Sequence, residues 1–171
     1  MLNSSSGSLT IQKACDKVID VAVNNNTVAY AYLANGGGEI NGGGFSQLEV
    51  IIGGNNSANQ ITAGSGGSSL WGGAGGNDIL TGGTGQDNFF FGKGDGADII
   101  NNAGSSDVVN LYDVTLADIT AATASGNKIS VTFNTGSSLQ INSAENLSAT
   151  FKLADGSRWK LNHSSNTWQN A

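Results

Sequence analysis

The residues best suited to chemistry in this sequence are aspartates that recur inside glycine-rich stretches. The stretch GGTGQDNFF, residues 82–90, fits the nine-residue pattern G-G-x-G-x-D-x-U-x at every position, where U is a large apolar residue. In such a stretch the glycines let the backbone turn where a side chain would clash, Asp87 supplies a hard oxygen ligand, and Phe89 points from a short strand into a core. The pattern therefore predicts a site for a hard cation beside a turn between short strands.

The same pattern repeats along the middle of the chain. Backwards from Phe89, the large apolar position recurs at spacings of nine, ten, nine and nine residues, filled by Leu80, Leu70, Ile61 and Ile52. The ten-residue step contains one added glycine, most simply Gly76, which a loop absorbs readily. A fixed period of this kind predicts a solenoid, in which each repeat is one turn and stacked turns share a core.

Two looser copies follow, in FGKGDGADII and NNAGSSDVVNL, residues 91–100 and 101–111. Their candidate turn and wall residues are Gly94, Gly96, Asp98, either Ile99 or Ile100, and then Asp107 with the apolar residues after it.

With these repeats the chain resembles the RTX family, the secreted hemolysin-type proteins whose nonapeptides wind into a right-handed parallel β-roll. The resemblance covers residues 46–111 and is tight over residues 72–100. It implies a flattened two-sheet coil whose consecutive turns alternate between two edges. Turns two repeats apart would then stack and share a calcium ion.

The resemblance also implies a set of calcium ligands. Asp78 would stack on Asp98 and Asp87 on Asp107, and only these two pairs supply two carboxylates for an ion that takes about six to eight oxygens. The pair of Asp78 and Asp98 is the stronger candidate, because both lie in glycine-rich turns. The full set of candidate metal-site residues is Asp78, Asp98, Asp87, Asp107, Asp95 and the turn glycines Gly73, Gly75, Gly82, Gly83, Gly85, Gly94 and Gly96.

Other positions leave alternatives open. Asn59 and Ser68 fill the acidic position of earlier turns, which we expect to be calcium-poor, although a half site between the turns of Ser68 and Asp87 stays open. Asp95 departs from the ligand position by three residues and could reach an ion directly or through water. Any aspartate could instead accept backbone N–H groups in a local Asx-type turn. That interpretation is favoured outside the repeats, for Asp113, Asp118 and Asp155.

The composition excludes several classes of function. The 171 residues carry a net charge of -6 and only seven scattered basic residues, so no basic face exists to bind nucleic acid. No apolar run approaches the roughly 20 residues of a membrane span. With one cysteine, Cys15, and one histidine, His163, the sequence has no internal disulfide and no zinc motif, and it shows no catalytic triad. We therefore expect no enzymatic activity.

Both flanks predict β-hairpin caps. Before the repeats, residues 18–23 and 27–34 alternate as two strands of a hairpin, although a helix over residues 9–23 competes. The glycine-rich residues 35–45 are either a flexible linker or a loose first turn of the coil. A solenoid needs such caps, because its last turn otherwise exposes an apolar wall and an unpaired strand edge.

After the repeats, residues 111–119 form the expected hinge and could hold a short helix. Two more hairpins are expected, around Thr135-Gly136 and Asp155-Gly156. The chain thus divides into an N-terminal β cap at residues 1–45, a calcium-binding roll at 46–111 and a C-terminal β cap at 112–171.

Together these features predict an all-β protein, a parallel β-roll with hairpin caps at both ends, that binds calcium and is secreted. The N-terminus lacks the basic and apolar regions of a Sec signal, and the resemblance implies one-step bacterial type I export. The expected role is structural, with calcium and further copies of the chain as partners in a filament or surface layer. The alternative is a non-catalytic stabilising or secretion module of a larger exported enzyme or adhesin.

Overall fold

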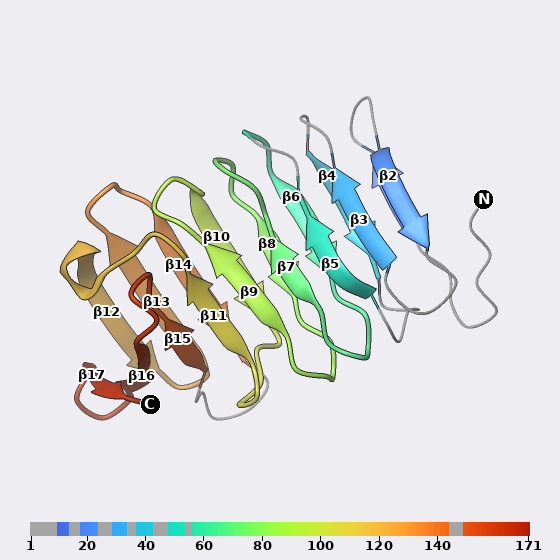
Figure 1. The fold of residues 1–171 in the computed structure, drawn as a ribbon. Coiled ribbons are helices and arrows are strands. Elements are labelled where there is room, and N and C mark those ends of the chain that lie inside the picture. Colours follow the sequence, from blue (N-terminus) through green and yellow to red (C-terminus); the bar gives the residue numbers. More distant parts are fainter. Residues whose placement is uncertain are drawn as a thin grey trace.

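β-strands account for nearly all of the regular secondary structure in a computed structural model, which describes residues 10–13, 18–23, 29–33, 37–42, 48–53, 56–143 and 149–171. Among these residues the strands form two sheets that run along the length of the molecule (Figure 1). The eight-stranded sheet contains, in spatial order, β1 (Thr10–Lys13), β4 (Gly38–Asn41), β6 (Asn59–Thr62), β8 (Ile79–Thr81), β10 (Ala97–Asn101), β14 (Ser138–Asn142), β13 (Lys128–Phe133) and β12 (Ile119–Ser125). The nine-stranded sheet contains β17 (Thr167–Asn170), β16 (Arg158–Asn162), β15 (Thr150–Lys152), β11 (Val108–Leu111), β9 (Asn88–Phe91), β7 (Ser69–Trp71), β5 (Leu48–Ile52), β3 (Ala29–Leu33) and β2 (Val18–Val23).

From β3 to β11 the chain alternates between the two sheets. Each strand in this stretch pairs in parallel with the strand two positions later, so the backbone winds as a flattened coil. Glycine-rich turns and apolar residues at a period near nine produce this arrangement, because each repeat supplies one short strand and one tight turn. The predicted all-β, two-sheet architecture is confirmed.

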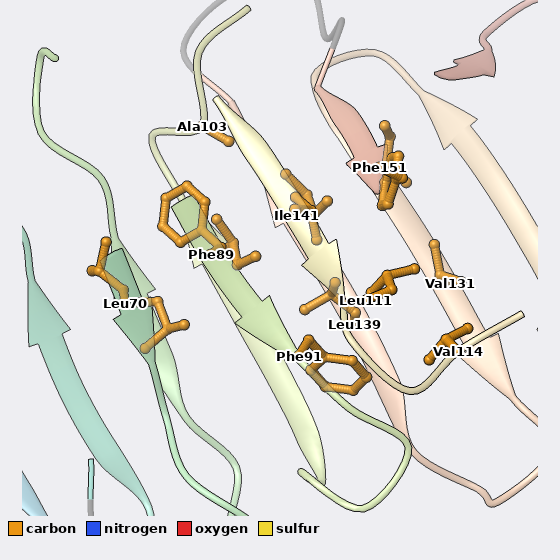
Figure 2. Packing of buried hydrophobic residues seen from close by; sticks show 14 of the residues in the cluster. Leu70, Phe89, Phe91, Ala103, Leu111, Val114, Val131, Leu139, Ile141 and Phe151 are labelled. Atoms are coloured by element: carbon orange, nitrogen blue, oxygen red, sulfur yellow. The ribbon is translucent and has the colours of Figure 1, made fainter. Parts of the chain in front are cut away.

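The core lies between the sheets and is built from rows of apolar side chains in register. In the nine-stranded sheet Leu70 pairs with Phe89, and Phe89 pairs with Val109. In the eight-stranded sheet Leu80 pairs with Ile100, and all four of Leu70, Phe89, Leu80 and Ile100 are at most 1% exposed. Figure 2 shows Leu70 and Phe89 on neighbouring strands, with the row continued toward the C-terminal cap by Phe151. Because side chains of a strand alternate between its faces, the residues between these positions are only half-buried.

The predicted wall residues need one correction. In the strand register Ile51 lies opposite Leu70 and Ile52 lies opposite Trp71, so the predicted register of this strand is wrong by one residue. The cause is an insertion shared by stacked turns: the steps from Ile51 to Ile61 and from Leu70 to Leu80 both span ten residues. At the looser repeat the structure decides between the two candidates, because Ile100 is buried and Ile99 is half-buried.

At the N-terminal end the predicted hairpin is confirmed, since β2 pairs with β3 antiparallel. The described residues of the competing helix, 10–13 and 18–23, are strands. The described part of the glycine-rich stretch, residues 37–42, belongs to the coil, which favours the loose turn over the linker. Within it β4 pairs in parallel with β6, and Ile40 is fully buried opposite Ile61. β1 runs antiparallel to β4 at the end of the eight-stranded sheet. Cys15 lies outside the described residues.

At the C-terminal end both predicted hairpins are confirmed. β13 pairs antiparallel with β14, and β15 with β16. The hinge contains the expected short helix, a 3-10 turn η1 (Leu116–Asp118). Aromatic side chains join the cap to the core: Phe133 stacks on Phe91 at 5.2 Å, and Trp168 meets Phe151 edge-on at 5.0 Å between ring centroids. No helix among the described residues is long and apolar enough to span a membrane.

Candidate metal centre at the turns of the coil

The coil has two edges, and their turns differ in length. We call A edge the turns that lead from the nine-stranded to the eight-stranded sheet, residues 56–59, 72–78 and 92–98. We call B edge the turns that lead back, residues 63–68, 82–87 and 102–107. The wall-to-wall steps at the B edge, Ile61 to Leu70, Leu80 to Phe89 and Ile100 to Val109, all span nine residues. Those at the A edge span ten, ten and eleven, for Ile51 to Ile61, Leu70 to Leu80 and Phe89 to Ile100.

The structure brings together both of the predicted aspartate pairs. At the A edge the backbone N–H of Asp78 donates to Oδ1 of Asp98 at 2.9 Å. At the B edge the N–H of Asp87 donates to Oδ1 of Asp107 at 2.8 Å. All four residues are at most 3% exposed. The carboxylates therefore lie inside the edges of the coil, each joined to the turn one full coil earlier.

The same positions in the earlier turns hold neutral side chains that make similar bonds. Asn59 and Ser68 are buried, and their backbone N–H groups donate to Oδ1 of Asp78 and Asp87, both at 2.7 Å. In the next strand of this sheet, β14, Leu139 is in register with Asp98 and is buried. The ladder of polar side chains therefore ends at apolar positions of the C-terminal cap.

The second carboxylate oxygen distinguishes the two edges. At the B edge Oδ2 of Asp87 accepts the N–H of Gly83 at 2.7 Å, and Oδ2 of Asp107 accepts that of Gly104 at 2.6 Å. At the A edge Oδ2 of Asp78 is buried and has no hydrogen-bond donor. It lies against Gly72, where an added Cβ would approach it to 2.2 Å. A buried carboxylate oxygen without a donor is costly, because it has lost water and gained nothing in return.

Asp95 lies in the last A-edge turn and is saturated by protein donors. Its carboxylate accepts the indole N–H of Trp71 at 2.9 Å, the N–H of Gly92 at 2.8 Å and the hydroxyl of Tyr112 at 2.9 Å. The rings of Trp71 and Tyr112 meet edge-on with centroids 6.2 Å apart. Asp95 thus fastens three successive coils together, and Trp71 has a packing role on the surface of the sheet.

Burial shifts the acid–base behaviour of these carboxyls. Loss of water raises the pKa of Asp78 and of Asp87 to about 6, and that of Asp98 to about 8 with a further contribution from the charges of Asp78 and Asp95. Burial also raises the pKa of Asp95. In the part of the chain that the structure describes, no Lys or Arg forms an ion pair with any of them; Lys93 pairs with Asp118 at 3.3 Å. The cluster therefore needs protons or an added cation to be neutral.

The predicted glycine ligands lie in the turns beside these carboxylates. Gly73, Gly75 and Gly96 have positive φ, a conformation that favours glycine. A Cβ on Gly83 or Gly96 would come within 2.0 Å of a carbonyl oxygen of the stacked turn, so these glycines also allow the turns to stack closely. The N–H of Gly75 donates to the carbonyl of Gly94 at 2.9 Å, which ties the two A-edge turns together.

Asn102 is a site residue that the sequence analysis did not single out. Its side-chain nitrogen donates to the carbonyl oxygens of Gly82 and Gly83, each at 3.0 Å, and so bridges two B-edge turns. A hollow of about 310 Å³ lies beside it, lined also by Gly85 and Asp107. In the register of β8 and β10, Asn102 occupies the position that Gly82 has one coil earlier. A change from glycine to asparagine at this repeat position is the sequence feature that could have indicated it.

Two of the three aspartates outside the repeats accept hydrogen bonds from backbone groups close to them in sequence. Asp118 caps η1 through the N–H of Thr115, and Asp155 accepts the N–H of Ser157, so both predicted turn roles are confirmed. Both pKa values are lowered by these hydrogen bonds. Asp113 departs from the prediction, because it accepts the N–H of Lys93 in the neighbouring coil, at 2.9 Å.

The potential metal ligands at these edges are hard oxygens, the type that calcium prefers. Among the described residues no three Asp, Glu, His or Cys side chains converge closely enough to hold a metal ion by themselves. An ion at either edge would therefore need backbone carbonyl oxygens of the turn glycines beside the two stacked carboxylates. No family model and no curated protein matches this sequence.

Proposed function

We propose that this chain is a secreted, non-catalytic β-roll of the RTX type that binds calcium in its turns and is stabilised by it. The observation that supports this most directly is the buried Oδ2 of Asp78, which has no donor, in a residue whose backbone N–H bonds the carboxylate of Asp98. A divalent cation would supply the missing partner and neutralise both charges. No protein cation of the described residues does so.

The residues that would hold the ion are those of the stacked turns. Asp78 and Asp98 would supply charge at the A edge, with carbonyl oxygens from the turns of Gly73, Gly75 and Gly96. Asp87 and Asp107 form the second candidate pair, at the B edge. When bound, calcium would supply positive charge and a coordination shell that tie two turns together. The chain's own part is to hold the two carboxylates in register through the parallel strands on either side.

Folding of the chain would then depend on the calcium concentration around it, and so on whether it lies inside or outside the cell. A ligand that binds only the folded state contributes about 2.7 kcal/mol at a hundredfold excess over its dissociation constant. That is a large fraction of the stability of a marginal domain. In a calcium-poor cytosol the buried acids would oppose folding and keep the chain competent for export. In the extracellular medium the ion would order the coil.

A structural or self-assembling role outside the cell follows from the open ends of the sheets. Among the described strands β1 and β12 end one sheet, and β2 and β17 end the other, so their outer edges are available to pair with another copy. The alternative is a stabilising or export module of a larger exported protein. One contact favours this alternative: the N–H of Ala124 on β12 donates to Oδ1 of Asn166 at 2.6 Å, which satisfies part of that edge within the chain.

Isothermal titration of the calcium-free chain tests the proposal. We expect one or two ions per chain, with the tighter one lost in Asp78→Asn and in Asp98→Asn. Asn keeps an oxygen that accepts the cross-turn N–H and removes only the charge. Asp155→Asn is the control, because Asp155 lies in an exposed turn of the C-terminal cap. Absence of calcium binding in the folded wild type, or equal binding in all three variants, would rule out the site.

A further inference from the structure

The two edges of the coil offer a cation different numbers of free oxygens. At the B edge both oxygens of Asp87 have backbone donors, the N–H groups of Ser68 and Gly83. Both oxygens of Asp107 are also bonded, to the N–H groups of Asp87 and Gly104. The carboxylates that would charge a B-edge site are therefore already satisfied by the protein.

Two backbone carbonyl oxygens of the B edge also have a donor from the protein. The amide nitrogen of Asn102 lies 3.0 Å from the carbonyl oxygens of both Gly82 and Gly83. An amide NH₂ group has two hydrogens to donate, so these two bonds use its full capacity. Carbonyl oxygens of the turn glycines are the ligands that a B-edge ion would need. The side chain of Asn102 thus supplies the positive end of a dipole where an ion would supply a charge.

The A edge differs in its carboxylates, because Oδ2 of Asp78 is buried without a donor. An asparagine amide also bonds carbonyl oxygens at this edge, but one coil earlier: Nδ2 of Asn59 donates to the carbonyl oxygens of Ser57 and Gly72 and to Oδ1 of Asp78, each at 2.9 Å. These partners belong to the turns of Asn59 and Asp78, whereas Asn102 bonds turns of the Asp87 and Asp107 pair itself. Of the two pairs, the one at the A edge has the unsatisfied oxygen.

We propose that Asn102 takes the place of a calcium ion at the B edge, and that calcium binding by the described coil is confined to the turns of Asp78 and Asp98. This inference rests on the proposed calcium function and adds to it a stoichiometry of one and a residue that sets it. Neutral asparagine in the position of Gly82 makes the B edge independent of calcium. The stabilisation of the coil by calcium then comes from the A edge alone.

The proposal predicts that a second site can be opened. Asn102→Gly restores the residue type found one coil earlier, and the positive φ of Asn102, 57°, suits glycine. Loss of the amide frees the carbonyl oxygens of Gly82 and Gly83 beside a hollow of about 310 Å³ that Asp107 also lines. Asn166→Gly is a matched control, because Asn166 also has positive φ, 52°, but lies in the turn between β16 and β17.

The test is the calcium stoichiometry, measured by titration with calcium chloride, of the wild type, Asn102→Gly, Asn166→Gly, Asp78→Asn and Asp87→Asn. We expect one ion in the wild type, lost in Asp78→Asn and kept in Asp87→Asn. Asn102→Gly should bind two ions and Asn166→Gly one.

The alternative outcomes separate this inference from the proposed function. Two ions in the wild type, one of them lost in Asp87→Asn, would overturn the role of Asn102 and leave the calcium function intact. A folded Asn102→Gly that still binds one ion would also overturn it. No ion in the wild type would reject the calcium function itself. If Asn102→Gly does not fold, loss of the single wild-type ion in Asp87→Asn rather than Asp78→Asn overturns the inference, and the reverse supports it.

Discussion

At the scale of single residues, buried aspartates are the main feature of this protein. Three of them, Asp78, Asp87 and Asp98, are nearly inaccessible to water. Each accepts a hydrogen bond from a backbone N–H of the stacked turn one coil earlier. These hydrogen bonds favour the charged carboxylates, while burial disfavours them more strongly, so the pKa values of all three are raised. The cluster is thus stabilised by whatever removes its charge.

This predicts an unusual pH dependence in the absence of calcium. A carboxyl whose pKa is higher in the folded state binds more protons there than in the unfolded chain, so stability falls as pH rises. The decrease should begin near the ordinary pKa of 3.8 and continue through about 6 and about 8, the folded values for these residues. Thermal unfolding in calcium-free buffer should therefore show a lower melting temperature at pH 8 than at pH 5. A melting temperature that rises across this range would contradict the assignment.

A second prediction concerns Asp95, which departs from the ligand position but is by sequence a candidate to reach an ion, and which the structure shows bonded to Trp71, Gly92 and Tyr112. Asp95→Ala leaves the indole N–H and the hydroxyl without their shared acceptor. A hydrogen bond to a charged group contributes about 1.5–3 kcal/mol, so the free energy of unfolding should fall by about that amount or more. Tyr112→Phe, which removes one of these bonds, should cost less. Calcium stoichiometry should not change in either variant; loss of an ion in Asp95→Ala would show that Asp95 is a ligand.

At the scale of elements, the turns determine how closely the coils stack. Gly96 has a φ of 108°, and a Cβ there would lie 1.9 Å from the carbonyl oxygen of Gly76 in the stacked turn. Gly94, two residues earlier in the same turn, has no heavy atom within 4 Å of the equivalent position. The two glycines therefore form a matched pair.

Gly96→Ala should destabilise the protein strongly and Gly94→Ala hardly at all. The backbone conformation alone costs about 1–3 kcal/mol for a residue with a side chain, and the contact with Gly76 adds to this. For a chain of this size about 1 kcal/mol corresponds to a change of roughly 2–4 °C in melting temperature. Thermal unfolding of both variants with saturating calcium gives the comparison. Equal melting temperatures would show that the turns do not stack as described.

The sequence predicts the elements well wherever its pattern is strict. The stretch from Gly82 to Phe90 predicts a strand, a turn and a buried wall residue, and all three are present because every position is filled by the required type. In β5 the register position opposite Leu70 is Ile51, one residue before the Ile52 that the period predicts. An insertion shared by two stacked turns changes the period without changing the composition, so counting by nine cannot locate it.

The details of the site depend on contacts between repeats, which a period does not contain. The resemblance implies the stacking of Asp78 on Asp98, which the contact between the two residues matches. The bonds of Asn102 to Gly82 and Gly83, and those of Asp95 to Trp71 and Tyr112, join different coils through side chains that the nine-residue pattern leaves unspecified. Such contacts depend on register, and register is a property of the folded sheets.

At the scale of the whole molecule, the two ends of the coil are where we propose that copies associate. The edges of β1 and β2 at one end, and of β12 and β17 at the other, are the outermost strands of the described sheets. We predict self-association that requires calcium, because an unfolded chain presents no edge of defined register. Light scattering over a range of protein concentrations, with millimolar calcium and in calcium-free buffer, measures it. A folded chain that stays monomeric at high concentration with calcium would favour the accessory-module alternative.

The measurement that tests the central claim most directly is thermal unfolding of the calcium-free chain as calcium is added, followed by circular dichroism. The account predicts that stability rises with calcium concentration, by about 2.7 kcal/mol at a hundredfold excess over the dissociation constant. The rise should be absent in Asp78→Asn and unchanged in Asp155→Asn. A wild-type chain that unfolds at the same temperature with and without calcium would contradict the account.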